Sequence, residues 1–513
     1  MRVEAHVRSG LPGVTIVGLP GAAVREARER VRSGAASSGL ALPTRRITVN
    51  LSPGEVPKDG SGFDLPIALA TLAACGQIPA ECVRGVGAVG EMSLDGIIRP
   101  TRGLLSVAET ATRMGVRQLV GPMECLPAAA VLGLDVVLGV RSLTEAVAVV
   151  TSSVSRDRVQ ERGRRWLRST KVSDTPTPDH DDLAEVVGHE QPKRALEIVA
   201  AGGHHLLMVG SPGAGKTMLA RRLPGILPPL SPAESLEVTR IWSAAAMPIT
   251  QGALVATRPF RAPHHTASRA ALVGGGVNLR PGEVSLAHRG ILFLDELPEF
   301  SRDALEALRE PLADGRISVS RRSGTSLFPA ACTLVAAMNP CPCGYLGHME
   351  KDCRCQAAAI DRYRARLSGP LLDRVDALIE VPPLTLFSLQ NERLGESSSL
   401  VRARVVAARE FRRKRQSESN DAQSWVGSSL EHRGWDCPPA MSTCLATGSR
   451  LNKQARDLMH RALAQDGLSG RAYTRVIGLA RTIADLDQVE EVDVQHVAEA
   501  LSLRLDYRRV GLL

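Results

Sequence analysis

Aromatic residues are scarce in this sequence, making up only 3% of its 513 residues. Proteins that hold single-stranded nucleic acid mainly by stacking bases on exposed rings need more of them, so that binding mode is disfavoured. Long apolar runs are also missing, since no stretch approaches the roughly 18 residues of a membrane span. The first residues, MRVEAHVRSG, lack the apolar segment of a secretory signal. We therefore expect a cytoplasmic protein without a membrane partner.

Cysteine is sparse too, and four of the ten cysteines cluster in one short segment. This usage excludes a disulfide scaffold and favours thiols that are reduced or bound to metal. Basic residues outnumber acidic ones by 63 to 54, and the net charge of +9 is compatible with a polyanionic partner such as nucleic acid. The apolar share of 44% can fill several cores, and the length predicts roughly two to four domains.

Hydrophobic patterning divides the chain into four predicted parts. Residues 1–150 alternate β-rich and helical runs, which predicts an α/β domain. Residues 151–182 begin basic, end acidic and have little apolar periodicity, so they are interpreted as a linker. Strands and helices alternate again over residues 183–383, and residues 384–513 follow a helical pattern. The polar stretch 417–450 receives no functional assignment.

The elements expected within these parts are short. The strands predicted in the first domain cover residues 14–18, 47–51, 118–120 and 136–138. The predicted helices cover residues 22–33, 65–75 and 104–114 in the first domain, and 471–485 and 492–505 near the end of the chain.

A glycine-rich loop follows an apolar run at residues 206–209 and precedes a helical pattern. It fits the motif G-x-x-x-x-G-K-[ST], in which backbone N–H groups and the positive end of the following helix face phosphate oxygens. The lysine is expected to reach the β- and γ-phosphates of ATP, and the threonine hydroxyl to ligate Mg²⁺. A chance glycine loop is the alternative, which the flanking strand and helix disfavour. The predicted nucleotide-binding residues are Gly210, Ser211, Pro212, Gly213, Ala214, Gly215, Lys216 and Thr217.

Two further apolar runs end in polar side chains. GILFLDELPEF delivers Asp295 and Glu296 to the carboxyl end of a buried strand, beside the phosphates. Asp295 is expected to hold the Mg²⁺ sphere, and Glu296 to polarise the attacking water. TLVAAMN ends in Asn339, on a strand expected to lie between the other two. Its amide is expected to touch the γ-phosphate or to orient the water, the alternative being a turn residue before Pro340.

Two arginines are candidates for added positive charge at the γ-phosphate, which stabilises phosphoryl transfer. Arg374 in SGPLLDRVD follows an apolar helix end and is predicted to be an arginine finger for a neighbouring subunit, with a surface ion pair as the alternative. Arg471, at the start of a helical segment, is predicted to fold back onto the nucleotide as a second sensor. Arg475, one turn further on, competes for that role.

These strings resemble the YifB/ComM group of magnesium-chelatase-like AAA+ ATPases. The matching strings are RPFRAPHHTAS, RPGEVSLAHRGILFLDELPEF, AAMNPCPCG, SGPLLDRVD and ARTIADL, and the resemblance covers nearly the whole chain. It implies an AAA+ αβα domain, a C-terminal helical lid and a homo-hexameric ring. It also implies a further strand ahead of VEAHVRSGLPG, so Met1 is expected to be a late start or the first domain to be trimmed.

The resemblance implies two insertions in the ATPase domain. One lies within residues 257–289 and includes the glycine run 274–276. The other is a β-hairpin at RISVSRRSGTSLFPA, where an apolar and polar alternation precedes a turn near Ser323 and Gly324. Arg321 and Arg322 at its tip are candidates for phosphate contacts in a ring pore, with a solvated tip as the alternative. His264 and His265 are interpreted as structural or pore-loop residues rather than metal ligands.

Residues 46–66 and 90–122 resemble the Lon-type serine protease domain, a Lon/S5-like fold. Lon-like enzymes use a Ser–Lys pair, with the serine shortly after a PKDG string. Here the serine slot holds Gly62, with Ser61 one place early, and the lysine slot holds Leu105. Leu105 cannot take a proton, so the domain is predicted to be non-catalytic. A similar degraded domain in a recombination ATPase serves assembly and DNA binding.

Four cysteines follow Asn339 in the pattern C-x-C-x₉-C-x-C. Four thiolates suit tetrahedral Zn²⁺, although C-x-C is tighter than the usual C-x₂-C spacing. Structural zinc and reduced thiols in a loop remain open as alternatives. The candidate ligands are Cys341, Cys343, Cys353 and Cys355.

Three functions compete. ComM-type proteins are similar to DNA motors that promote branch migration in homologous recombination and natural transformation, which makes single-stranded or branched DNA the expected substrate and recombination proteins the expected partners. A protein-remodelling ATPase like the magnesium chelatase motor subunit is the alternative, since it shares the ATP site. An ATP-dependent protease is disfavoured by Gly62 and Leu105. DNA-stimulated ATP hydrolysis would separate the first function from the others.

Overall fold

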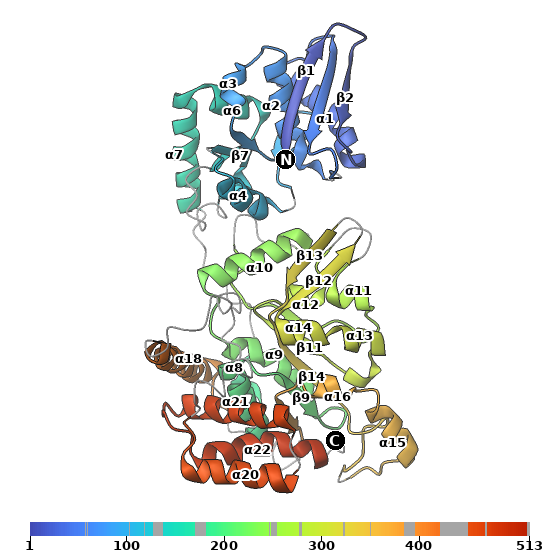
Figure 1. The fold of residues 1–513 in the computed structure, drawn as a ribbon, viewed down its shortest axis with the longest axis vertical. Helices are drawn as coiled ribbons and strands as arrows, with labels where there is room; N and C mark the ends of the chain where they lie inside the picture. Colours follow the sequence, from blue (N-terminus) through green and yellow to red (C-terminus); the bar gives the residue numbers. More distant parts are fainter. Residues whose placement is uncertain are drawn as a thin grey trace. The chain divides into compact units, whose positions relative to one another are not determined.

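The computed structural model describes residues 1–56, 58, 60–101, 103–116, 118–126, 137–169, 181–245, 247, 254–275, 280–321, 324–348, 350–383, 395–420, 450–466 and 469–509. They divide into two compact units (Figure 1). Met1–Pro176 and Ser235–Val255 make up the first unit, and Thr177–Glu234 and Ala256–Leu513 the second. Among the described residues, no helix is both long and apolar enough to cross a membrane.

The first unit is an α/β fold with two three-stranded sheets. In one sheet β3 (Arg46–Ser52) lies between β1 (Arg2–Arg8), which is antiparallel to it, and β2 (Gly13–Val17), which is parallel. The other sheet is parallel, with β7 (Gln118–Pro122) between β4 (Val86–Ala88) and β8 (Val137–Val140). A short ribbon joins β5 (Glu91–Met92) to β6 (Ile98–Arg99).

Helices complete the first unit. The buried side of β3 carries Ile47, Val49 and Leu51, which alternate with partly exposed residues and share a core with α1 and α2. The predicted strands and helices of this unit are confirmed within a few residues, whereas β1, β4, β5, β6, α3 and α6 were not predicted. The helices are α1 (Ala22–Ser37), α2 (Asp64–Ala74), α3 (Ala80–Val83), α4 (Leu104–Arg113), α6 (Leu143–Thr151) and α7 (Ser153–Ser169), with 3₁₀ turns η1 (Ser61–Phe63) and η2 (Met123–Cys125).

Helix α7 corrects the predicted linker, which was placed at residues 151–182. Residues 153–169 are helical and pack on α6 and β8. The apolar side chains of α7 are few, but Val159 is buried and Trp166, seven residues further on, joins a core cluster. The Arg162 guanidinium adds an ion pair to Glu145 of α6. Because the apolar stripe is narrow and lies among many arginines, the sequence pattern did not indicate this helix. The rest of the predicted linker up to residue 180 lies outside the described residues.

The second unit is built on a five-stranded parallel sheet with the order β10-β11-β14-β9-β15. Its strands are mainly apolar because both faces are covered, with Arg261, Thr333 and Glu380 at strand ends. Odd and even positions face opposite cores: Leu206 and Met208 of β9 join one, and Leu207 and Val209 join the other. The strands are β9 (Leu206–Val209), β10 (Phe260–Arg261), β11 (Ile291–Leu294), β14 (Thr333–Met338) and β15 (Ala377–Glu380).

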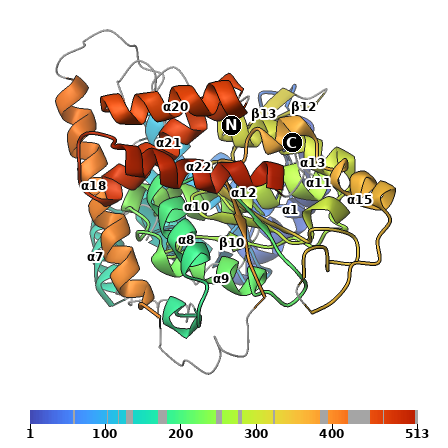
Figure 2. The ribbon, with the colours of Figure 1, turned by 90° about the horizontal axis from the view of Figure 1, so that it is seen from below.

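One face of this sheet is covered by α8, α9 and the C-terminal helices, whose apolar residues share its core. Helix α22 packs against α20, α21 and β15, and α18 against α8, α9 and α21 (Figure 2). These helices are α8 (Glu190–Gly202), α9 (Lys216–Ile226), α18 (Ser398–Asn420), α20 (Lys453–Asp466), α21 (Gly470–Leu486) and α22 (Val494–Arg509). The predicted helical character of the C-terminal part is thus confirmed.

Short helices and a hairpin complete the second unit. The hairpin pairs β12 (Arg316–Arg321) with β13 (Gly324–Pro329) in antiparallel register. Helix α10 (Pro232–Ala245) starts here, although its residues from Ser235 on belong to the first unit. The remaining elements are η3 (Leu183–Glu185), α11 (Arg269–Val273), α12 (Glu283–Leu286), η4 (Leu297–Glu299), α13 (Arg302–Ala307), α14 (Arg309–Asp314), α15 (Ala357–Arg364) and α16 (Gly369–Leu372).

Candidate active site

The loop between β9 and α9 contains the predicted nucleotide-binding residues from Gly210 onward. Gly210 lies against the neighbouring strand, since a Cβ there would be 2.3 Å from the carbonyl oxygen of Val381. Gly213 and Gly215 have φ angles of 79° and 88°, which glycine adopts without strain. The loop therefore curls tightly before the first turn of α9, where N–H groups without helical partners can meet phosphate oxygens.

The Lys216 ammonium group is enclosed by oxygen atoms. Its Nζ donates to the carbonyl oxygens of Gly210 at 2.7 Å and Ser211 at 2.9 Å, and to Oδ1 of Asn339 at 3.1 Å. Burial lowers the pKa of Lys216, and nearby carboxylates oppose that shift. Asn339 follows β14, which lies between β9 and β11 as predicted. Two motifs far apart in the sequence therefore meet at one amine.

Thr217 and Asp295 bring two oxygen atoms together. Oγ1 of Thr217 donates to Oδ2 of Asp295 across 2.7 Å. Neighbouring ligands of an octahedral Mg²⁺, each about 2.1 Å from the metal, lie about 3 Å apart. The spacing of the two side chains thus fits the magnesium role that both were predicted to share.

Glu296 has a contact that the sequence did not reveal. Its backbone N–H donates to Oδ1 of Asp295 at 2.9 Å, and its φ of 52° lies in the left-handed region. Backbone strain of this kind is concentrated at functional sites. Oε2 of Glu296 lies 3.1 Å from Nδ1 of His265. His265 follows β10 and Glu296 follows β11, so the parallel pairing of these two strands was the signal that could have related them.

Arg374 and Arg471 lie at the opposite edge of the sheet from the phosphate-binding loop. Arg374 precedes β15, whose first residue pairs with Leu206 at the start of β9, whereas the loop follows the end of β9. The four residues of β9 span about 13 Å, which is the distance between the two ends of this strand. Nη1 of Arg471 lies 3.4 Å from Oδ2 of Asp373, beside Arg374. The assignment of Arg471 as the second sensor stays a prediction.

The position of helix α21 explains why Arg471 lies beside Asp373. Arg475, the competing candidate, is paired with Asp376, a buried carboxylate at the start of β15. Asp376 also accepts from the backbone N–H of His205 at 2.8 Å. A buried charge needs such partners, so this cluster fixes the beginning of α21, with Arg471, at the amino edge of the sheet.

The surroundings of Arg374 are electropositive. Its guanidinium donates to the carbonyl oxygens of Arg309 at 2.9 Å and Pro370 at 2.8 Å. Burial lowers the pKa of Arg374, and the charges of Arg309, Arg471 and Arg475 lower it further. Asp373 opposes that shift, and Arg471 and Arg475 are themselves paired with Asp373 and Asp376.

Family comparisons agree with this architecture in all three parts of the chain. The description "Subunit ChlI of Mg-chelatase" matches residues 3–125. "Magnesium chelatase, subunit ChlI" matches residues 182–389, which include the phosphate-binding loop, Asp295, Glu296, Asn339 and Arg374. "Magnesium chelatase, subunit ChlI C-terminal" matches residues 395–504, the helical part.

Relatives match nearly the full length. YifB of Salmonella typhimurium is 43% identical over 505 residues, which cover 98% of this chain and 93% of the relative. The competence protein ComM of Haemophilus influenzae is 40% identical over 517 residues, covering 98% and 94%. The chain belongs to the YifB/ComM family of magnesium-chelatase-like AAA+ ATPases. The predicted resemblance and fold class are confirmed.

Part of this YifB/ComM protein is similar to part of a Lon protease. The protein of Chloroflexus aurantiacus is 35% identical over 133 residues, covering 24% of this chain and 16% of the relative. In the structure Ser61 Oγ donates to a carboxylate oxygen of Glu91. The buried Lys58 Nζ donates to the carbonyl oxygen of Pro53, so Ser61 and Lys58 contact different partners. Leu105 lies in the first turn of α4.

The YifB/ComM hairpin has the predicted form. Arg321 pairs with Gly324 at the end of the ladder, which leaves a two-residue connection. Arg322 and Ser323 lie outside the described residues, and for Arg321 only the backbone is described. The other predicted insertion contains α11 and α12, with a bridge between Gly275 and Arg280. Residue 276, the last of the glycine run, lies outside the described residues.

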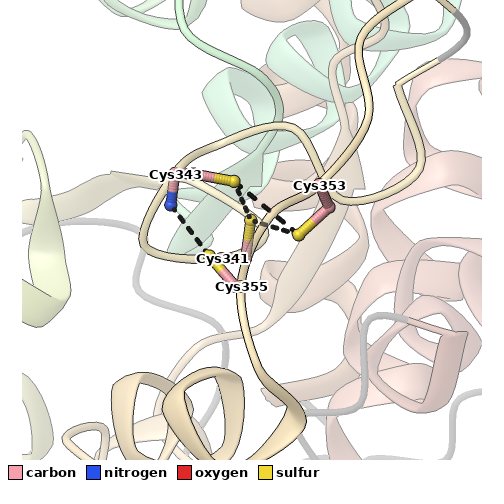
Figure 3. Close-up of side chains that lie close together, drawn as sticks. All are labelled: Cys341, Cys343, Cys353 and Cys355. Carbon is pink, nitrogen blue, oxygen red and sulfur yellow. Dashed lines mark hydrogen bonds between the residues drawn. The ribbon is translucent and has the colours of Figure 1, made fainter.

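The four clustered cysteines converge in one loop of this YifB/ComM protein (Figure 3). Sγ of Cys341 lies 3.4 Å from Sγ of Cys343 and 3.6 Å from Sγ of Cys353, and the latter two are 3.7 Å apart. The backbone N–H of Cys343 donates to Sγ of Cys355 at 3.4 Å. All four sulfurs lie within 4.8 Å of one another. The predicted ligand set is therefore brought together in space.

Proposed function

We propose that this protein is an ATP-driven, ring-forming DNA motor, a branch migration helicase that acts in homologous recombination and natural transformation. The full-length similarity to the competence protein ComM carries the proposal. ATP hydrolysis is supported by the hydrogen bonds of Lys216 with Asn339 and of Thr217 with Asp295 at the carboxyl ends of the strands. We place the protein in the cytoplasm, with DNA and recombination proteins as its partners.

The described side chains suggest a division of labour in ATP hydrolysis. The P-loop N–H groups and Lys216 would hold the β- and γ-phosphates, and Thr217 and Asp295 would hold Mg²⁺, which neutralises phosphate charge when bound. The Glu296 carboxylate would accept a proton from the attacking water. Asn339, already bonded to Lys216, would orient that water beside the γ-phosphate.

The candidate ATP-site residues lie at both ends of the sheet strands, and this arrangement supports a ring in which neighbouring subunits share each site. Arg374 and Arg471 lie beyond reach of the phosphate-binding loop of their own chain, because they precede β15 or contact the residues before it. Phosphoryl transfer gains from a cation supplied by a neighbour. We therefore propose that both arginines enter the ATP site of the next subunit in a homo-hexamer, and that Arg471 acts there as the second sensor.

Two further parts are assigned roles under this proposal. The arginines Arg321 and Arg322 at the tip of the β12–β13 hairpin would contact DNA phosphates without regard to sequence. The four-part division at residues 150, 182 and 383 is kept as a functional proposal, in which the segment 151–182 comprises α7 and the residues after it. The N-terminal domain would serve assembly or DNA binding rather than proteolysis, and the four clustered cysteines would hold a structural Zn²⁺.

Branch migration of a labelled three-stranded junction tests the function. We expect product that requires ATP and is lost in Glu296→Gln, while ATP binding is retained. ATP hydrolysis that ignores DNA and gives no product would instead favour a protein-remodelling ATPase. Casein cleavage that requires ATP and disappears in Ser61→Ala would refute the non-proteolytic assignment.

A further inference from the structure

The cysteine loop lies directly on the phosphate-binding loop. Gly344, between the second and third cysteines, has a φ of 82°. A Cβ at this position would lie 2.5 Å from Cδ and 2.6 Å from Cγ of Pro212, and 3.8 Å from Cγ of Asn339. The backbone at Gly344 is therefore in direct contact with a residue that shapes the ATP site.

The cysteine loop is shaped by turn hydrogen bonds and by contacts among its own side chains, such as the ring contact of Tyr345 with His348. Between the end of β14 at Met338 and the start of α15 at Ala357, the described residues form neither helix nor strand. Cys341 is fully buried, whereas the other three cysteines are only partly covered. Ordering such a segment costs conformational entropy that a small apolar contact does not offset. A cross-link through the four sulfurs would hold the loop in one conformation.

The sulfur geometry identifies the kind of cross-link. A disulfide requires an S–S distance of about 2.05 Å, and the measured separations of 3.4, 3.6 and 3.7 Å are longer. Four thiolates about 2.3 Å from one tetrahedral Zn²⁺ lie about 3.8 Å apart, close to these values. Thiolates that bind separate irons of a [4Fe–4S] cluster are spread more widely. The set therefore fits a single tetrahedral ion.

We propose that Zn²⁺ bound by Cys341, Cys343, Cys353 and Cys355 controls ATP binding. The metal holds the loop in the shape that seats Gly344 on Pro212. The same loop begins next to Asn339, which contacts Lys216 at 3.1 Å. Zinc therefore stabilises two of the elements that receive the phosphates, and its loss lowers the affinity for ATP. This inference rests on the proposed ATPase function of the site.

A pair of glycine variants isolates the contact from the metal. Gly344→Ala places a methyl group into the Pro212 ring, whereas Gly347→Ala, in the same loop with a φ of 79°, meets no atom within 4 Å. Both variants carry the same kind of backbone strain. We expect Gly344→Ala to keep one zinc per chain and to weaken binding of a fluorescent ATP analogue about tenfold relative to Gly347→Ala. Equal affinities in the two variants would overturn the proposed coupling.

Metal content supplies the second measurement. We expect about one zinc per full-length chain purified without chelator, by elemental mass spectrometry. Cys353→Ser, or treatment of the wild type with a zinc-selective chelator followed by added Mg²⁺, should remove the zinc and weaken the ATP analogue about tenfold or more. Zinc well below one equivalent, or zinc loss without a change in affinity, would overturn the inference. Wild-type protein that holds zinc but binds no ATP would refute the proposed ATPase instead.

Discussion

Nδ1 of His265 lies 3.1 Å from Oε2 of Glu296, the carboxylate proposed to activate water. The two residues follow adjacent parallel strands, β10 and β11. The Glu296 side chain is half exposed, and the backbone N–H of Glu296 donates to Oδ1 of Asp295 at 2.9 Å. A contact to one carboxylate oxygen restrains the group and leaves its second oxygen free for a water proton. We therefore predict that His265 positions the Glu296 carboxylate.

Removal of this contact should lower turnover without lowering ATP affinity. For His265→Ala we expect kcat to fall about tenfold, with KM for ATP within about twofold, because a misoriented base affects the chemical step. The control is His264→Ala, since Nδ1 of His264 lies 2.9 Å from Oγ1 of Thr266 instead. Steady-state ATP hydrolysis measures both. Equal kcat values in the two variants, or a change confined to KM, would contradict the positioning role.

The placement of Arg374 predicts that inactive variants complement each other. Arg374→Ala and Glu296→Gln should each lose at least about 100-fold in ATP hydrolysis. In a ring assembled from both, some sites receive an intact arginine from one subunit and an intact glutamate from the next. We therefore expect mixtures to regain measurable activity that neither variant shows alone. Mixing that restores nothing, although mixed rings form, would mean that Arg374 serves its own chain or no site.

His205 predicts a loss of stability in mild acid. Burial lowers its pKa to about 4 from the ordinary 6.5, against the opposing charge of Asp376. Nδ1 accepts from the backbone N–H of Leu334 at 3.0 Å, which requires the neutral ring. As the pH falls, the unfolded chain binds a proton before the folded one. The contribution is therefore complete above pH 6.5 and lost between pH 6.5 and pH 4.

The expected loss is about 2 kcal/mol at pH 5 relative to pH 7.5. His205→Asn keeps an acceptor near the Leu334 N–H but cannot titrate, so it should reduce the pH dependence by that amount. Thermal unfolding at both pH values compares the two proteins. An identical pH dependence in wild type and variant would contradict the assignment.

Substitution of Asp485 is predicted to lower the stability of the helical lid. Its fully buried carboxylate lies 3.1 Å from Arg412, 3.1 Å from Arg415 and 3.0 Å from Arg481. Asp485→Asn leaves the buried guanidinium groups without their counter-charge, which should cost about 3 kcal/mol of stability. Asp487→Asn, at a half-exposed carboxylate, is the control and should change stability by less than about 0.5 kcal/mol. Similar unfolding temperatures for the two variants would show that the cluster contributes no such stability.

Local sequence patterns determined much of this protein. The apolar run ahead of Gly210 predicted a strand buried on both sides, because a strand covered on two faces has no polar alternation. The loop glycines predicted a tight phosphate-binding turn, since Gly213 and Gly215 require positive φ. The order of motifs placed Asn339 between Lys216 and Asp295, and the structure confirms the central position of β14.

The tertiary structure decided the contacts between segments that local patterns do not relate. The docking of α21 on the β15 side, fixed by the buried pair of Arg475 and Asp376, moved Arg471 to the amino edge of the sheet. The pairing of β10 with β11 brought His265 to Glu296, and the fold of the cysteine loop brought Gly344 to Pro212. Strand and turn formation depend on neighbouring residues, whereas these contacts depend on which surfaces pack together. Packing is a property of the whole chain, so only the folded structure reveals them.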